Sequence, residues 1–306
     1  MKERLDTLLV RRGLCPTRQQ AQRLIQAGWV QVNQQVVDKA GAWVAPDSHI
    51  TIQARPPYVS RGGEKLAHAL DVFGIAVSDR VALDGGIATG GFTDCLLQRG
   101  ARRVYGVDVG YGQVAWCLRQ DPRVRLLERT NLRYLQPQQI YQADDPWPDL
   151  GVVDVAFISV TKILPALWHL LTPPREAVIL VKPQFEVGRA QIHKGGVVKD
   201  VRAQAQAIAQ VAQAARQQGW QVQGLTHSPL LGPAGNREYF LWLGTSGPAI
   251  PEVAWEATIA QVMASSPTQE TSGHLKNTGP FPATDRQKIP PDNRSLWFPF
   301  PAPLGQ

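Results

Sequence analysis

The chain has 306 residues and a formal net charge of +7, from 32 Lys and Arg against 25 Asp and Glu. It is long enough for two domains, and no stretch approaches the roughly 18 apolar residues that a membrane helix needs. The three cysteines have neither C-x-x-C nor Cys/His metal spacing, which argues against a disulfide framework and a zinc site. The charged start of the chain does not resemble a signal peptide. We therefore expect a cytoplasmic protein with reduced thiols, no membrane association and no bound metal.

Residues 1–54 predict a small α+β domain. Apolar side chains recur at helical spacing over 4–14 and 18–27, and short apolar strands follow between 29 and 53. Residues 1–70 contain ten Lys and Arg against five Asp and Glu, which favours a polyanionic partner. The alternative is that these cations are ordinary solvated surface residues.

Residues 55–60 indicate a linker, because Pro56 and Pro57 interrupt any regular structure there. A helix is expected to begin at Arg61 and to carry Lys65 just ahead of the next strand. Lys65 is either a solvated helix residue or, because of this position, a functional one.

A glycine-rich turn connects the apolar strand expected at 80–83 to the helix expected at 93–100. It reads Asp84-Gly85-Gly86-Ile87-Ala88-Thr89-Gly90-Gly91-Phe92. Paired glycines between a strand and a helix let a ligand approach main-chain N–H groups at the helix N-terminus. The G-x-G-x-x-G spacing of a dinucleotide site is missing, and Asp84 suits a ligand end that carries an ammonium group. The alternative is a turn whose glycines serve strand–helix packing alone.

Strands and helices alternate after this turn, which predicts a mostly parallel, doubly wound, Rossmann-like α/β sheet. The strand expected at 103–109 contains Asp108 near its end, where the ribose hydroxyls of a ligand lie in such a sheet. The strand expected at 123–127 is followed by Asn131, which we expect beside an adenine.

Further charged side chains fall at the ends of later strands. Asp154 interrupts the apolar strand expected at 150–158, and Lys182 follows the next strand. A lone buried carboxylate is costly unless it is paired or lies at an open strand end. If the last strand is antiparallel, its first residues, with Glu238, lie at the same edge as Lys182. The alternative for Asp154 and Lys182 is a structural salt bridge.

The apolar pattern fails after residue 248. The stretch from Pro251 onward holds nine of the 24 prolines together with Ser, Thr and Gln. This composition predicts a disordered tail over 249–306.

Several motifs occur in the order and spacing of a known family. They are Ser60–Leu66, Thr89–Asp94, Val107–Gly112, Phe157–Ser159, Lys182–Glu186 and Gly232–Asn236. With them the chain resembles the hemolysin A-type (TlyA) family of ribosomal RNA 2′-O-methyltransferases. The N-terminal residues Arg4-Leu5-Asp6, Thr17-Arg18 and Val32-Asn33 resemble the RNA-binding domain named after ribosomal protein S4.

The resemblance implies an FtsJ-like methyltransferase domain over 61–248, with S-adenosylmethionine as cofactor and ribosomal RNA or ribosomal subunits as partner. It implies no obligate protein partner. The matching catalytic positions are Lys65, Asp154, Lys182 and Glu238. The expected cofactor-binding residues are Asp84, Gly86, Thr89, Gly90, Gly91, Phe92, Asp108, Val109 and Asn131. The expected RNA-binding residues are Arg4, Arg11, Arg18, Arg23, Lys39 and Arg61.

Methyl transfer from a sulfonium to a ribose 2′-hydroxyl requires in-line alignment and removal of a weakly acidic proton. Our hypothesis is that Lys182 acts as the base, while Asp154 and Glu238 orient the two lysine amines.

Three other functions are considered. Gly85, Ala88 and Ala156 differ from the residues usual in the family, so one alternative is an RNA-binding protein with an inactive methyltransferase domain. Another is a membrane-active hemolysin, as the family name suggests. A nicotinamide dehydrogenase is disfavoured by the missing dinucleotide spacing.

Overall fold

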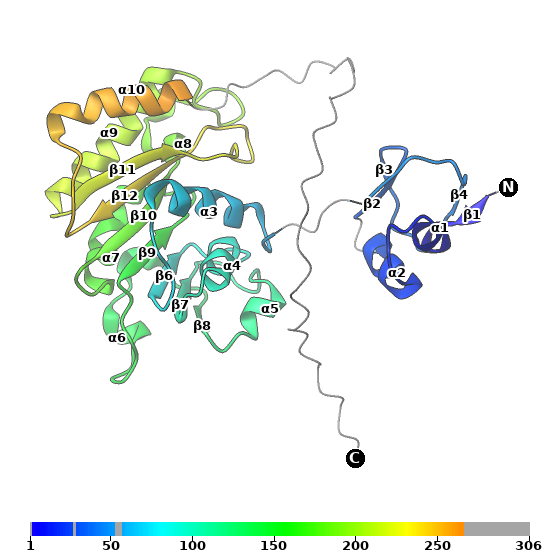
Figure 1. Cartoon of the computed structure of the whole chain (residues 1–306). Coiled ribbons are helices and arrows are strands. Elements are labelled where there is room, and N and C mark those ends of the chain that lie inside the picture. Colours follow the sequence, from blue (N-terminus) through cyan, green and yellow to red (C-terminus); the bar gives the residue numbers. More distant parts are fainter. Residues whose placement is uncertain (1, 27–28, 53–56, 266–306) are drawn as a thin grey trace, which may run out of the picture. The chain divides into compact units, whose positions relative to one another are not determined.

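A computed structural model describes residues 2–26, 29–52 and 57–265. These residues form an N-terminal domain and a larger α/β domain, each with its own hydrophobic core (Figure 1). Part of the linker expected at 55–60 lies outside the described residues.

The N-terminal domain is a small α+β unit, as predicted. Its elements are β1 Glu3–Arg4, α1 Leu5–Arg11, α2 Arg18–Gln26, β2 Val30–Val32, β3 Gln35–Val36, β4 Trp43–Val44 and β5 Ile50–Ile52. One sheet has the order β3-β2-β5, and β1 pairs with β4. The core forms because Leu5, Leu9, Ala21 and Ile25 point from the two helices onto Val30 of the sheet.

The larger domain contains a seven-stranded sheet with the order β11-β12-β10-β9-β6-β7-β8. Its strands are β6 Val81–Gly85, β7 Arg103–Val107, β8 Val124–Leu127, β9 Leu150–Val153, β10 Glu176–Val181, β11 Gln221–His227 and β12 Tyr239–Gly244. Only β12 runs antiparallel to its neighbours. The predicted Rossmann-like sheet with an antiparallel last strand is therefore confirmed.

Helices cover both faces of this sheet (Figure 1). They are α3 Arg61–Phe73, α4 Gly91–Gln98, α5 Trp116–Arg119, α6 Pro137–Ile140, α7 Leu164–Leu170, α8 Pro183–Glu186, α9 Val201–Gln217 and α10 Trp255–Ser265. Short 3-10 helices are η1 Leu132–Tyr134, η2 Val160–Lys162, η3 Arg189–Gln191 and η4 Glu252–Ala254. Adjacent residues of one strand enter different cores: Val152 packs with α3 and α4, and Val153 with α7 and α9. Burial on both faces explains why the central strands are almost wholly apolar, with Asp84 of β6 as an exception.

Two predictions about element bounds are wrong. The strand expected at 150–158 ends at Val153, so Asp154 lies at an open strand end rather than inside the sheet. The tail expected to be disordered over 249–306 contains η4 and α10. Trp255, Ile259 and Met263 are spaced four residues apart, and this stripe packs into the core beside α9 and β11. Residues 266–306 lie outside the described part of the chain.

Among the described residues, no helix has the length and apolar character that crossing a membrane requires.

Candidate active site

Four charged side chains meet at the carboxyl end of the large sheet. Lys65 comes from the first turns of α3, Asp154 follows β9, Lys182 follows β10 and Glu238 precedes β12. Because β12 is antiparallel to β10, the start of β12 lies beside the end of β10. The shared edge expected for these residues is present in the structure.

The four side chains form two ion pairs of different character. Lys65 Nζ lies 2.5 Å from Glu238 Oε2, and these side chains are only 9% and 1% exposed. Lys182 Nζ lies 2.5 Å from Asp154 Oδ1 in a more open pair, without hydrogen-bond geometry. Loss of either partner of the buried pair would leave an uncompensated charge, so this pair holds α3 to β12. The side chains of Lys182 and Asp154 are more exposed, at 14% and 24%.

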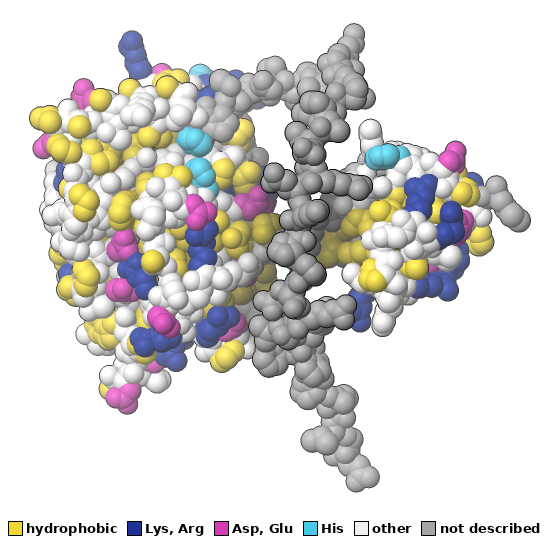
Figure 2. Space-filling view, in the orientation of Figure 1, with side chains coloured by type: hydrophobic (Ala, Val, Ile, Leu, Met, Phe, Trp, Pro, Cys, Tyr) yellow, Lys and Arg dark blue, Asp and Glu magenta, His cyan; other side chains and the backbone are white. Residues whose placement is uncertain are grey.

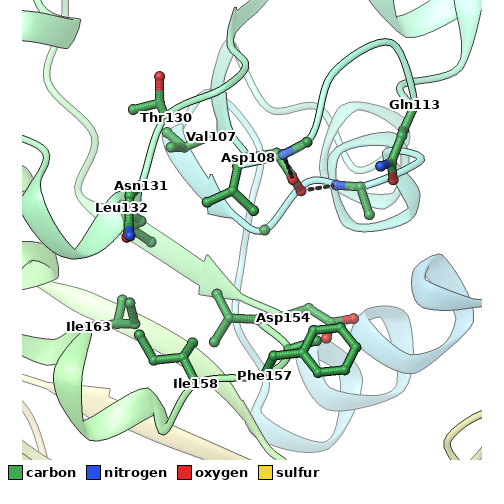
Figure 3. A pocket seen from close by; sticks show the side chains of 16 residues that line it. Val107, Asp108, Gln113, Thr130, Asn131, Leu132, Asp154, Phe157, Ile158 and Ile163 are labelled. Carbon is green, nitrogen blue, oxygen red and sulfur yellow. Dashed lines mark hydrogen bonds between the residues drawn. The ribbon is translucent and has the colours of Figure 1, made fainter.

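A cavity of about 510 Å³ opens beside the open ion pair. It is lined by Gly86, Ala88, Val107, Asp108, Val109, Gly110, Gln113, Thr130, Asn131, Leu132, Asp154, Val155, Ala156, Phe157, Ile158 and Ile163. In Figure 3, Asp154, Phe157 and Ile158 lie along one side and Asp108 and Thr130 along the other. The volume and the mixture of apolar walls with a few polar groups are typical of a small-molecule site.

Asp108 is fixed in the wall of this cavity by two backbone donors. Its Oδ2 accepts a hydrogen bond from Ala88 N at 2.8 Å, and its Oδ1 accepts one from Gly110 N at 2.6 Å (Figure 3). The carboxylate thus ties the turn after β6 to the loop after β7 and stands in a defined orientation at the pocket wall.

Gly86 brings the glycine-rich turn against the sheet edge that carries Asp154. Its φ is +88°, and a Cβ there would lie 2.4 Å from the carbonyl oxygen of Asp154. Only glycine satisfies both conditions. The turn that borders the pocket and the segment that carries Asp154 are therefore in direct backbone contact.

Comparison with protein families identifies the chain. The FtsJ-like methyltransferase family matches residues 58–245, and the S4 domain matches residues 3–49. The chain belongs to the FtsJ-like methyltransferase family. S-adenosylmethionine is accordingly its cofactor. The cavity fits this molecule, because an oriented carboxylate suits a ribose diol and the apolar walls suit an adenine.

Curated relatives and solved structures agree with this assignment. The 16S/23S rRNA (cytidine-2′-O)-methyltransferase TlyA of Mycobacterium tuberculosis is 48% identical over 246 residues, which cover 80% of this chain and 90% of that protein. Hemolysin A of Brachyspira hyodysenteriae is 38% identical over 77% of this chain and 97% of its own length. A solved structure from Streptococcus thermophilus, described as a hemolysin, is 40% identical with a TM-score of 0.65, covering 86% of this chain and 96% of that one.

In this FtsJ-like domain, four of the nine expected cofactor residues border the cavity. They are Gly86, Asp108, Val109 and Asn131. The other five do not line it. Thr89 is exposed, Gly90 is the residue before α4, Gly91 begins α4 and Phe92 packs against Phe240. Gly91 still has a role in spacing, because a Cβ there would lie 2.9 Å from Gly63 N at the start of α3.

The fifth, Asp84, lies inside the sheet rather than at the strand tip where we expected it. It is fully buried, and its Oδ2 accepts a hydrogen bond from Thr93 Oγ1 at 2.6 Å. Its Oδ1 is buried without a hydrogen-bond partner among the described residues. Burial raises the pKa of Asp84 to about 7. Because β6 extends through Gly85, the carboxylate is held behind the turn and not in the pocket.

The departures from the family pattern leave the pocket intact. The backbone N–H of Ala88 donates the hydrogen bond to Asp108, so this bond does not depend on a polar side chain at position 88. A Cβ atom at Gly85 would lie 2.5 Å from Leu132 Cδ2, so the Leu132 side chain already fills the space that a larger residue would need. Leu132 in turn lines the pocket. Ala156 is also part of the lining.

Sequence reasoning missed Phe157 as a feature of the pocket. Its side chain is 93% exposed although it borders the cavity, and its φ of +64° is costly for a residue with a bulky side chain. Such strained residues cost of order 1–3 kcal/mol and cluster at functional sites. The nearest ring is Phe185, at 5.4 Å between centroids. Phe157 belongs to a recognised motif, but no sequence pattern predicts its backbone angle.

The basic residues expected to bind RNA fall into two groups. Arg4 and Arg18 both donate hydrogen bonds to the buried Asp6, and Arg11 pairs with Glu3. Arg23, Lys39 and Arg61 form no ion pair within the described part of the chain. Figure 2 shows Lys and Arg side chains on the visible face of the N-terminal domain. Internal pairing thus fixes some of these cations, and the others are free for a ligand.

Proposed function

We propose that this protein transfers a methyl group from S-adenosylmethionine to a ribose 2′-hydroxyl of ribosomal RNA. One observation carries the proposal: the Lys182–Asp154 ion pair stands at the wall of the cofactor pocket, with Asp154 itself in the lining. The substrate class is supported by the S4 domain and by relatives that are named rRNA 2′-O-methyltransferases at 48% identity. A ribosomal RNA substrate would support the expected cytoplasmic location, which is part of the same proposal.

The cofactor supplies an electrophilic methyl group when it is bound. The chain must then align a ribose hydroxyl with that group and accept its proton. We assign proton acceptance to Lys182 Nζ, with Asp154 orienting the amine and stabilising the ammonium that forms. Lys65, held by Glu238, supplies a second cationic group whose position cannot drift because both side chains are buried.

Recognition of the nucleotide would use two further features. Phe157 presents an exposed aromatic ring at the mouth of the pocket, and unpaired RNA bases stack on such rings. The cations of the N-terminal domain would contact phosphates, which position an RNA without reading its sequence.

The decisive experiment uses unmodified ribosomal subunits and labelled S-adenosylmethionine. The unaltered protein is expected to label RNA, with the label in a 2′-O-methylnucleotide after nuclease digestion. Lys182→Ala is expected to lower the rate by roughly 10²–10⁴-fold, the usual worth of a general base. Lys182→Arg, which keeps the charge but cannot act as a base, serves as the matched control and should bind S-adenosylhomocysteine normally.

Two results would count against the proposal. No label from the unaltered protein on any ribosomal particle would contradict the enzymatic function and favour an RNA-binding protein with an inactive domain. Undiminished label from Lys182→Ala would contradict the base assignment alone.

A further inference from the structure

Glu186 is a buried carboxylate that the reaction described above does not use. It is the last residue of α8 and is only 8% exposed. Its Oε2 accepts a hydrogen bond from Ser159 Oγ at 2.6 Å, and its Oε1 accepts one from Val160 N at 2.8 Å. Burial raises the pKa of Glu186, whereas these two donors oppose the rise. Both carboxylate oxygens are thus committed to one neighbouring segment.

That segment is a wall of the cofactor pocket. Residues 155–158 all line the cavity, and they run from Asp154 to the start of η2, where Ser159 and Val160 lie. Within the segment Phe157 has a left-handed backbone and an almost fully exposed side chain. A strained residue keeps its conformation only where the surrounding contacts determine it. The two hydrogen bonds from Ser159 and Val160 to Glu186 anchor the far end of this wall.

The α8 region also contains Lys182, the lysine of the open ion pair. Lys182 is the residue immediately before α8, and Glu186 ends α8 one turn later. The near end of the wall is Asp154, whose carboxylate pairs with Lys182. The 155–158 wall is therefore held at both ends by residues of the α8 region. Lys182 pairs with Asp154 before the wall, and Glu186 accepts hydrogen bonds from Ser159 and Val160 after it.

We propose that Glu186 is a positioning residue, which holds the 155–158 wall in the shape that binds the cofactor and keeps Asp154 beside Lys182. The effect on cofactor binding depends only on the pocket, whereas the effect on the reaction rests on the proposed function. Glu186 touches no reacting atom, and it acts through Ser159 and Val160.

The test measures the affinity of the full-length protein for S-adenosylhomocysteine by calorimetry, below the melting temperature of every variant. Glu186→Gln leaves one acceptor oxygen and turns an N–H₂ group toward a donor, so we expect about tenfold weaker binding. Glu186→Ala removes both acceptors and should weaken binding further. Ser159→Ala removes one of the two hydrogen bonds and should act in the same direction with a smaller change.

Glu176→Gln is the matched control. Glu176 lies at the other end of β10, where its carboxylate accepts a hydrogen bond from Trp242 Nε1 at 2.8 Å and pairs with Arg80. This variant should change the melting temperature and leave the affinity for S-adenosylhomocysteine unchanged. With RNA and saturating cofactor, Glu186→Gln should also show a lower kcat, because the segment that follows Asp154 is held less firmly.

Unchanged affinity in Glu186→Gln and Ser159→Ala would overturn the proposal, as would equal weakening in Glu176→Gln. If Glu186→Ala does not fold, the other two variants decide. If the affinity shifts as expected but the unaltered protein labels no RNA, the proposed function fails and the positioning role stands.

Discussion

Two buried aspartates, one in each domain, show how differently the chain treats the same side chain. Asp6 of the N-terminal domain and Asp84 of the catalytic domain are both fully buried. Asp6 accepts hydrogen bonds from Arg4, Arg18 and Gln22, and these donors hold its pKa well below the usual range. Among the described residues, Asp84 has only one side-chain donor, and burial raises its pKa to about 7.

The difference shows which contribution wins at each site: charged donors outweigh burial at Asp6 and lower its pKa, whereas burial outweighs the single donor at Asp84 and raises its pKa. The N-terminal domain uses Asp6 to fix two arginines that come from β1 and α2. In the catalytic domain, Asp84 lies directly behind the glycine-rich turn, where one side-chain hydrogen bond does not offset the effect of burial. The charges of Asp108 and Asp154 raise its pKa further. The first aspartate serves the architecture of its domain, and the second makes the region behind the pocket sensitive to protons.

Replacement of Asp84 should give the largest effect. Because its folded-state pKa is raised, its stabilising contribution is complete below the unfolded pKa of about 4 and is lost as the pH rises to about 7. At roughly 1.4 kcal/mol per pH unit, the loss totals about 4 kcal/mol. Asp84→Asn should remove this loss, so urea unfolding at pH 5 and pH 8 should give more similar free energies for the variant than for the unaltered protein. Asp79→Asn, an exposed control, should keep the original pH dependence, and an equal flattening there would contradict the assignment.

Removal of Asp6 should have the next largest effect. Asp6→Ala deletes a fully buried acceptor and leaves Arg4, Arg18 and Gln22 without their shared partner. We expect a loss of about 3 kcal/mol, reduced from a fully buried case because both arginines can reach water. Calorimetry of the full chain should show it as a lower transition temperature of the N-terminal domain. Glu3→Ala, which breaks only the exposed pair with Arg11, should cost less than about 1 kcal/mol. Equal losses of stability in Asp6→Ala and Glu3→Ala would contradict the larger structural role assigned to Asp6.

The smallest effect concerns the cations that form no ion pair with other described residues. Arg23→Gln should lower the slope of log K against log salt for RNA binding by about 0.7 to 0.9, the value for one lost phosphate contact. Arg11→Gln should lower it less, since Arg11 already pairs with Glu3. Filter binding at four salt concentrations measures both slopes. If the two variants are indistinguishable, internal pairing does not determine which arginines meet the RNA.

Much of the architecture could be predicted because it depends on local patterns. Alternating apolar strands and helices determine the sheet, and the order of the motifs places Lys65, Asp154, Lys182 and Glu238 at one edge. The pairing of Lys65 with Glu238 could not be predicted, because side-chain direction at a sheet edge depends on how α3 packs. Asp84 was misplaced for a similar reason: the strand continues for two residues past Leu83, so the backbone of Asp84 pairs with Gly106 and Val152 and its carboxylate is buried against a face of the sheet.

Other features were hidden for different reasons. The stripe of Trp255, Ile259 and Met263 was visible at helical spacing, but the composition of the following residues outweighed it. The left-handed backbone of Phe157 could not be predicted, because bulky residues rarely adopt a positive φ and no local sequence pattern indicates one here.

The buried pair of Lys65 and Glu238 also has a consequence for biosynthesis. The two residues are 173 positions apart in the chain, so Lys65 is synthesised long before Glu238. Until β12 is inserted between β11 and β10, the sheet is incomplete and Lys65 must stay hydrated. A nascent chain therefore cannot form this ion pair early, and a truncated product that ends before residue 238 carries the glycine-rich turn without the pair. The ion pair can form only after synthesis of the domain has reached its last strand, β12.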